Sequence, residues 1–243
     1  MYVLEVKNLT KSYKKTLAVD HINFTLKDGE VTILAGPNGA GKTTTIKSIL
    51  GLLKKNDGEV LINGEALKKN KNKIAYIPET PEIYSYLTVW EHMKFIAFAY
   101  GLKDWEKKSE EILNNFNILD KKDEFGQSLS KGMRQKVSIS MALLHDPEIF
   151  FVDEPFIGLD PIGIKELKES FKFLRNEGKT ILISTHMLAL VEEIGDNIII
   201  MKKGNIIFSG NKLALKESIN CSEDESLEDL FVSLTTQSES TLK

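Results

Sequence analysis

Apolar residues recur at different spacings along this chain, and each spacing predicts a different element. Residues 3–6 and 22–26 read as strands, the second through strict alternation of apolar and polar positions. Residues 31–35 form an almost wholly apolar run, which predicts a strand buried on both faces, as in a parallel sheet. Residues 46–53 return to helical spacing. The order strand, loop, helix is therefore expected here.

The middle of the chain, about residues 81–145, has helical rather than strand-like spacing. Thr88 opens a Thr-x-x-Glu capping box and predicts the start of an apolar helix. Asp104 is predicted to cap a second helix that ends near Asn117, and a third helix is predicted to start after Ser130. We therefore expect a helical subdomain inserted into an α/β core.

Strand-like patterns return after this helical stretch. Residues 149–152 and 180–185 are short apolar runs, separated by a predicted helix over 164–176. Residues 198–201 and 205–208 flank a Lys-Lys-Gly turn and predict a hairpin.

The last part of the chain differs in composition from the rest. We expect residues 1–220 to form one α/β domain, with the helical subdomain inserted in it. The segment 221–243 is expected to be a linker, a short C-terminal helix over 226–234 and a flexible tail from residue 237.

Composition narrows the class of protein. The chain has 243 residues, 42% of them hydrophobic and 28% charged, which is typical of a folded globular protein. A net charge of -3 gives no electrostatic case for nucleic-acid binding. The single cysteine, Cys221, cannot form an intrachain disulfide and suits a reducing cytosol. The longest uncharged stretch, 180–191, is shorter than the roughly 20 residues of a membrane helix, so any membrane contact is expected to be indirect.

A glycine-rich loop links the buried-strand pattern to the following helix. Its sequence, GPNGAGKT, fills every fixed position of the phosphate-binding P-loop, and an ordinary glycine-rich turn is the alternative. Backbone N–H groups at a helix N-terminus and the Lys42 ammonium attract phosphate, and the Thr43 hydroxyl is placed to ligate Mg²⁺. The residues expected to bind ATP are Gly36, Pro37, Asn38, Gly39, Ala40, Gly41, Lys42, Thr43 and Thr44.

Two carboxylates end the apolar run that starts at residue 149. Open α/β sheets bind ligands at the carboxyl ends of their strands, where Asp153 and Glu154 stand. We expect Asp153 to hold Mg²⁺ and Glu154 to accept a proton from the attacking water. A merely charged strand end is the alternative, and the P-loop upstream favours the functional interpretation.

Together with two further motifs and one loop, these residues make the sequence resemble an ATP-binding cassette (ABC) ATPase over about residues 2–210. The resemblance implies an α/β fold: a P-loop NTPase core with a mostly parallel sheet, an N-terminal antiparallel β subdomain and an inserted α-helical subdomain. The motifs that carry it are the P-loop, Leu129-Ser130-Lys131-Gly132-Met133, Asp153-Glu154, Gly158-Leu159-Asp160 and Ser184-Thr185-His186.

The resemblance also implies roles for single residues. Tyr13 matches the aromatic residue on which adenine stacks, and His186 matches the switch histidine that senses the γ-phosphate. Ser130 and Gly132 match the signature that contacts ATP bound to a second cassette, and Asp160 matches the loop that links the two sites of the dimer. Simpler interpretations are a surface aromatic for Tyr13, a structural histidine, a helix cap for Ser130 and a turn former for Asp160.

The sequence departs from the family pattern at three positions. Lys131 and Met133 replace the first glycine and the glutamine of the usual signature, which removes an amide contact and brings a charge near the phosphate. Glu79 stands where the family more often has a glutamine that ligates Mg²⁺ and connects to the membrane partner. Glu79 keeps an oxygen ligand and adds a negative charge. These departures, and the chain's ending, resemble subunits that serve separate export-type permeases.

The interpretation that follows is an ATP-hydrolysing transport subunit. Lys42, Glu154 and His186 are expected to carry catalysis, while Thr43, Asp153 and Glu79 hold Mg²⁺. The expected partners are a transmembrane permease and a second ABC chain, either identical or a paralogue, without nucleic acid. The expected location is cytoplasmic and peripheral, at the inner face of the cell membrane. A soluble ABC ATPase without a transport role is the alternative, and a nucleotide-dependent binding module with little turnover is a further one.

Overall fold

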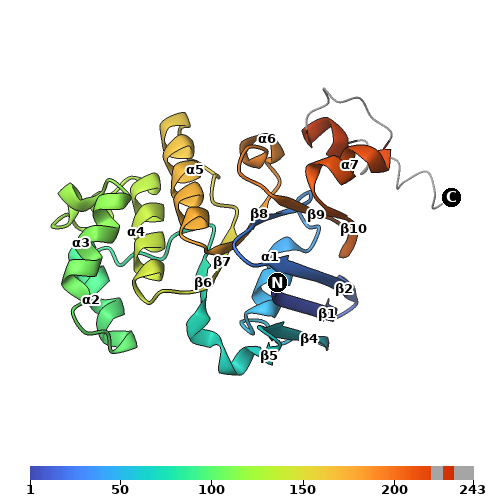
Figure 1. The fold of residues 1–243 in the computed structure, drawn as a ribbon, viewed down its shortest axis with the longest axis horizontal. Helices are drawn as coiled ribbons and strands as arrows, with labels where there is room; N and C mark the ends of the chain where they lie inside the picture. The colour runs from blue at the N-terminus through green and yellow to red at the C-terminus, as the bar shows by residue number, and fades with distance from the viewer. Residues whose placement is uncertain (220–226, 233–243) are drawn as a thin grey trace. The chain divides into compact units, whose positions relative to one another are not determined.

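The computed structural model describes residues 1–219 and 227–232 (Figure 1). The chain divides into two compact units, one made of Met1–Asn70 with Thr180–Lys243 and the other of Lys71–Lys179. Among the described residues, no helix is long and apolar enough to span a bilayer.

An antiparallel sheet opens the first unit, as the family resemblance implied. Its strand order is β2-β1-β4-β5. In the second half of β2, buried apolar residues alternate with exposed polar ones, so one face of the sheet packs into the core. The strands are β1 (Tyr2–Tyr13), β2 (Thr16–Lys27), β4 (Asp57–Ile62) and β5 (Glu65–Ala66), and a 3-10 turn η1 (Leu67–Lys69) follows.

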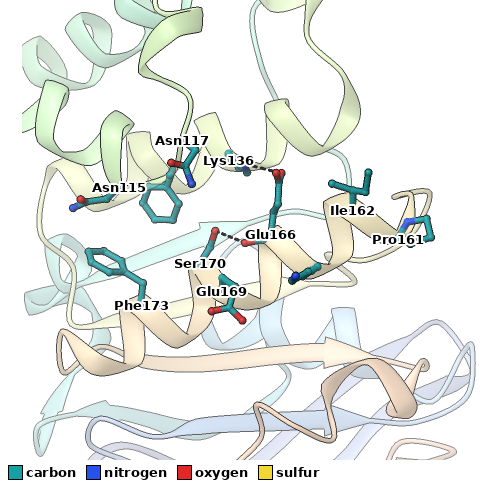
Figure 2. Close-up of a pocket in the computed structure, with 11 residues that line it drawn as sticks. Asn115, Asn117, Lys136, Pro161, Ile162, Glu166, Glu169, Ser170 and Phe173 are labelled. Carbon is teal, nitrogen blue, oxygen red and sulfur yellow. Dashed lines mark hydrogen bonds and ion pairs between the residues drawn. The ribbon is translucent and has the colours of Figure 1, made fainter.

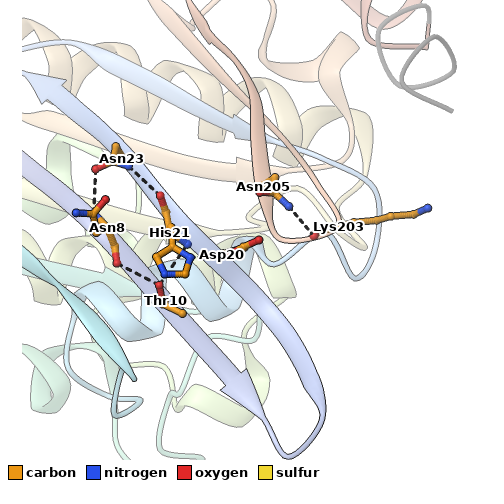
Figure 3. A network of polar contacts seen from close by, with 7 residues as sticks. All are labelled: Asn8, Thr10, Asp20, His21, Asn23, Lys203 and Asn205. Carbon is orange, nitrogen blue, oxygen red and sulfur yellow. Dashed lines mark hydrogen bonds and ion pairs between the residues drawn. The ribbon is translucent and has the colours of Figure 1, made fainter. Parts of the chain in front are cut away.

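A polar network holds an irregular part of the β1–β2 ladder (Figure 3). Asn8 and His21 both have positive φ, 50° and 46°, and the register shifts beside them. The Asn8 N–H donates to Asn23 Oδ1 at 2.9 Å, and the His21 N–H donates to Thr10 Oγ1 at 3.3 Å. Side chains therefore replace ladder partners that the bulge removes.

The same unit contains the strands that carry the glycine-rich loop. β3 pairs in parallel with both β8 and β9, and the predicted hairpin is confirmed by the antiparallel β9–β10 pair. All residues of β3 and β8 are buried, which explains why both strands contain only apolar and small hydroxyl residues and no charge. The elements are β3 (Val31–Ala35), α1 (Lys42–Ile49), β8 (Thr180–Thr185), α6 (Leu188–Val191), β9 (Asn197–Lys202), β10 (Asn205–Gly210) and α7 (Lys212–Ile219).

The C-terminal helix predicted over 226–234 is present where the chain is described. Residues 227–232 are helical, with Leu227 and Leu230 buried. Residue 226, residues 233–234, the linker from 221 and the tail from 237 lie outside the described residues.

The second unit combines two parallel strands with four helices. β6 pairs with β7, and α2, α3 and α4 pack against one another (Figure 1). Trp90 and Trp105 join α2 to α3, with ring centroids 5.1 Å apart. The elements are η2 (Lys71–Lys73), β6 (Ile74–Ile77), α2 (Val89–Tyr100), α3 (Trp105–Asn115), η3 (Leu119–Lys121), η4 (Gly126–Ser128), α4 (Lys131–Leu144), β7 (Ile149–Asp153) and α5 (Pro161–Asn176).

The predicted starts of α2, α3 and α4 are correct, α5 starts at Pro161 rather than Ile164, and the predicted side-chain cap at Asp104 is wrong. Thr88 and Glu91 form the capping box in both directions, at 3.1 and 2.7 Å. α3 starts after Asp104 and ends at Asn115, two residues earlier than predicted. The Asp104 side chain makes no capping hydrogen bond, because its φ of 50° is left-handed rather than the extended conformation of a side-chain cap.

Candidate functional site

The glycine-rich loop, residues 36–43, lies between β3 and α1, and we call it the phosphate loop. Gly41 is the N-cap of α1 with φ 108°. A Cβ atom on Gly41 would lie 2.5 Å from the Ala18 carbonyl oxygen, and one on Gly36 would lie 2.6 Å from that of Met201. Neither carbonyl can retreat without disturbing a strand. Only glycine fits at both positions, so the loop backbone packs tightly against the sheet.

Lys42 is a buried cation at the concave side of this loop. Its Nζ donates to the Gly36 carbonyl at 2.7 Å and to that of Pro37 at 3.4 Å. The first turn of α1 contains no acidic residue. The helix N-terminus and the ammonium therefore add two positive fields in one place, which is the electrostatics that a phosphate group needs.

Two acidic residues end strand β7 in the second unit. Asp153 and Glu154 are almost fully buried, with only 3% and 7% of their surface exposed. Glu154 has φ 46°, an unusual conformation for a residue other than glycine, asparagine or aspartate. Buried carboxylates in a strained turn at the end of a strand are typical of functional sites.

Tyr76 is a residue of this site that the sequence analysis missed. Its hydroxyl donates to Asp153 Oδ2 at 3.4 Å. Burial raises the pKa of Tyr76, and the charges of Asp153, Glu82 and Glu79 raise it further, so the phenol stays a donor. A tyrosine within the apolar pattern of a strand, three residues before Glu79, was the available signal.

Glu79, like Asp153, lies close enough to Tyr76 for its charge to raise the pKa of the phenol. β6 and β7 run in parallel, and Glu79 follows β6 as Glu154 follows β7. The described residues contain no group of three or more His, Cys, Asp or Glu side chains able to hold a metal. Mg²⁺ is commonly bound by one or two carboxylates with phosphate oxygens and water, so this donor set fits a cation that arrives with ATP.

Ser130 and Asp160 are helix N-caps as well as family-motif residues. Ser130 Oγ accepts from the Met133 N–H at 3.3 Å, and Asp160 Oδ1 accepts from the Gly163 N–H at 2.7 Å. The helix-cap interpretation of Ser130 is therefore correct, whereas Asp160 caps α5 rather than only forming a turn. Both residues are exposed, which leaves them accessible to another molecule as well.

Tyr13 and His186 lie at the ends of strands in the first unit. The Tyr13 ring is 44% exposed, and Lys11 Nζ lies 4.9 Å from its centroid. His186 is exposed directly after the fully buried strand β8, so it is not a core histidine. Both side chains are accessible to a nucleotide, and their roles remain predictions.

Comparison with known proteins decides the family. A family model described as "ABC transporter" matches residues 19–157, more than half of the chain. The chain belongs to the ABC transporter family. It is an ATP-binding subunit with the ATPase activity and the α/β fold of that family, as the resemblance in the sequence implied.

Individual ABC proteins resemble this chain over nearly its whole length. It is 37% identical over 241 residues to "ABC-type transporter ATP-binding protein EcsA" of Bacillus subtilis, covering 97% of both chains. It is 35% identical to "Lipopolysaccharide export system ATP-binding protein LptB" of Haemophilus influenzae, over 86% of this chain and 91% of that one. A solved structure described as "Structure of ATP binding subunit of ABC transporter" superposes with a TM-score of 0.86 and 38% identity, covering 96% and 99% of the two chains.

A surface pocket of about 500 Å³ lies elsewhere in the second unit of this ABC subunit (Figure 2). It is lined by α5 and by residues of α3 and α4, and the predicted site residues do not line it. Lys136 is buried there and its ammonium lies 2.8 Å from a carboxylate oxygen of Glu166. Phe116 and Phe173 close one end, edge to face.

Replacing Glu166 with alanine should destabilise the protein, because the buried Lys136 ammonium then loses its counter-charge. We expect a loss of about 1–2 kcal/mol in the free energy of unfolding, since Glu166 itself is partly solvated. Urea denaturation measures it. The matched control is Glu169→Ala, on the same helix, whose ion pair with Lys172 is exposed and should change stability by less than about 0.5 kcal/mol. Equal effects of the two substitutions would contradict the assignment.

Proposed function

We propose that two copies of this chain, or this chain and a paralogue, enclose Mg²⁺-ATP between the phosphate loop of one and the α4 N-terminus of the other. The observation that supports this is a second helix N-terminus that is suited to an anion. α4 follows its exposed N-cap, Ser130, and has no acidic residue in its first turn. Because each chain then carries both halves of a site, two-fold symmetry completes both.

Within such a site, different residues of the chain bind ATP and catalyse phosphoryl transfer. The phosphate-loop N–H groups and Lys42 hold the phosphates, and Tyr13 stacks on adenine. Glu154 accepts a proton from the attacking water, while His186 and Lys42 stabilise charge on the transferred phosphoryl group. Mg²⁺, held by Thr43, Asp153 and Glu79, neutralises phosphate charge when bound. The second chain contributes the Ser130 hydroxyl and the backbone of Lys131, Gly132 and Met133, and Asp160 links the two sites.

We infer that the chain docks on a transmembrane permease through an aromatic surface made of Tyr84, Tyr86 and Phe95. A pocket of about 520 Å³ lies among these side chains, with Leu87 at its edge. Tyr86 is 79% exposed, which is unusual for a tyrosine that has no partner to cover it. The surface follows Glu79 closely along the chain, so a permease bound there would lie near the ATP site's cation.

A buried histidine holds this aromatic surface in place. His92 Nε2 accepts from the Tyr84 N–H at 2.9 Å, while its Nδ1 lies 2.7 Å from the Thr88 carbonyl oxygen. Only the neutral tautomer with hydrogen on Nδ1 satisfies both contacts. Burial lowers the pKa of His92, which keeps that tautomer in neutral solution. The Tyr84 loop is therefore preorganised for a partner.

Replacing Tyr86 with serine should remove permease binding and leave the fold intact, because the ring makes little contact with its own chain. The measurement is capture of membrane proteins from solubilised membranes by the tagged subunit. Leu213→Ser, at a hydrophobic residue of α7 that is 65% exposed, is the matched control and should capture as the wild type does. An active wild-type ATPase that captures no membrane protein would favour the soluble, non-transport alternative.

Export is the proposed direction of transport, and the inner face of the cell membrane is the proposed location. Support comes from the similarity to a subunit whose name denotes lipopolysaccharide export. The signature departures at Lys131 and Met133 also resemble subunits that serve separate export-type permeases.

A further inference from the structure

Lys131, the residue that replaces a signature glycine, points at another loop of its own unit. It opens α4 directly after Ser130. Its Nζ donates to the main-chain carbonyl of Ile157. The same ammonium would lie 3.4 Å from a Cβ placed on Gly158, and Cδ would lie 3.6 Å from it. The side chain therefore lies across the Ile157–Gly158 turn.

Local electrostatics do not favour a lysine at this position. The N-terminal turn of a helix carries partial positive charge, which disfavours a cation there. The first turn of α4 has no acidic residue that could pair with Lys131. The contact with Ile157 is a charge-assisted hydrogen bond from one segment to a distant one, which offsets the unfavourable placement.

The turn under Lys131 belongs to the loop that joins Glu154 to Asp160. Inside this loop the hydrogen bonds are long: the Ile157 N–H lies 3.4 Å from the Glu154 carbonyl oxygen, and the Leu159 N–H lies 3.3 Å from that of Phe156. Glu154 and Gly158 both have positive φ. A loop with long internal bonds and one strained residue, Glu154, depends on outside contacts to keep one conformation.

We propose that Lys131 is a positioning residue that ties the signature turn, residues 129–133, to the loop carrying Glu154 and Asp160. The ammonium holds the midpoint of this loop. The signature turn contacts one ATP molecule and the Glu154 carboxylate acts on the other ATP molecule, so the tether fixes the positions of these two parts of one chain relative to each other. In the usual signature a glycine at this position has no side chain to make such a bond. This inference rests on the proposed composite site.

The test compares Lys131→Met, which keeps the aliphatic stem and loses the donor, with Lys131→Arg, which keeps a donor. For Lys131→Met we expect kcat for ATP hydrolysis to fall about three- to tenfold, with KM for ATP changed less than about twofold. Amide hydrogen exchange over residues 155–160 of the nucleotide-free protein should speed up by a similar factor. Lys131→Arg should stay within about twofold of wild type in both measurements.

The matched control is Lys55→Met, because the Lys55 ammonium also bonds a main-chain carbonyl, that of Gly58, in the other unit. It should change neither kcat nor exchange over 155–160. If Lys131→Met does not fold, Lys131→Gly, which restores the family residue, takes its place in the exchange measurement.

Three outcomes overturn the proposal. The first is unchanged exchange in Lys131→Met or Lys131→Gly. The second is a raised KM without faster exchange, which would mean direct phosphate contact by the ammonium. The third is a failure of Lys131→Arg to restore kcat. A wild type without ATPase activity would instead contradict the composite site, while the exchange comparison would still test the tether.

Discussion

Glu154→Gln is expected to bind ATP as the wild type does and to hydrolyse it at least about a hundredfold more slowly, because it loses the group that takes a proton from water. The substitution keeps the shape of a side chain that is almost fully buried. It also keeps an unbranched residue at a backbone position with φ 46°, so folding should be unchanged. Phosphate release measures hydrolysis, and size-exclusion chromatography with ATP measures the closed dimer that should accumulate.

Glu148→Gln is the control for this experiment. Glu148 immediately precedes β7, and its carboxylate lies 2.8 Å from the Lys73 ammonium on a partly exposed surface. The same chemical change there should leave hydrolysis within about twofold of wild type, since exposed ion pairs contribute little. If Glu154→Gln hydrolysed ATP as fast as wild type, the assignment of Glu154 as the base would be wrong.

Two inactive variants, Lys42→Ala and Gly132→Ala, should restore activity when they are mixed. Lys42→Ala removes the cation of the phosphate loop and with it ATP binding. Gly132→Ala should fold normally, because its new Cβ would lie 3.8 Å from the nearest side-chain atom, Leu159 Cδ2, and alanine is the better helix former. Its inactivity would come from blocking the close approach of the other chain's γ-phosphate.

In the mixed dimer one site has an intact phosphate loop facing an intact signature turn, and the other site has neither. Random pairing therefore predicts up to about a quarter of the wild-type rate if the chain forms homodimers with independent sites. Titrating one variant into the other while following phosphate release measures this. Absence of any recovery from two folded variants would contradict the composite site in a homodimer, and activity of a strictly monomeric wild type would contradict it outright.

The parts of the fold that the sequence predicted are those set by local pattern. The phosphate loop, the largely apolar β3 and β7, and the capping box of α2 each depend on residues near one another in the chain. β4, β6 and α6 were missed, since short elements carry too few residues to establish a period. The predicted cap at Asp104 was wrong because residue type alone does not fix backbone conformation.

Contacts between distant segments account for the parts of the site that were not predicted. The sequence marked Lys131 as unusual and placed its charge near a phosphate, yet the structure shows its ammonium bound to Ile157. Tyr76 could not be linked to Asp153 before the parallel pairing of β6 and β7 was known. Motif residues could be found from spacing, whereas their supporting partners required the tertiary structure.

The left-handed backbone of Glu154 implies a compromise between durability and turnover. A residue with a Cβ in this conformation lowers the free energy of unfolding by on the order of 1 kcal/mol relative to glycine. The residue in this conformation is Glu154, which is also the residue proposed to activate water. Glycine would relax the backbone here and remove the base. A more durable protein and a faster enzyme therefore require different residues at position 154, and this chain has the one that serves turnover.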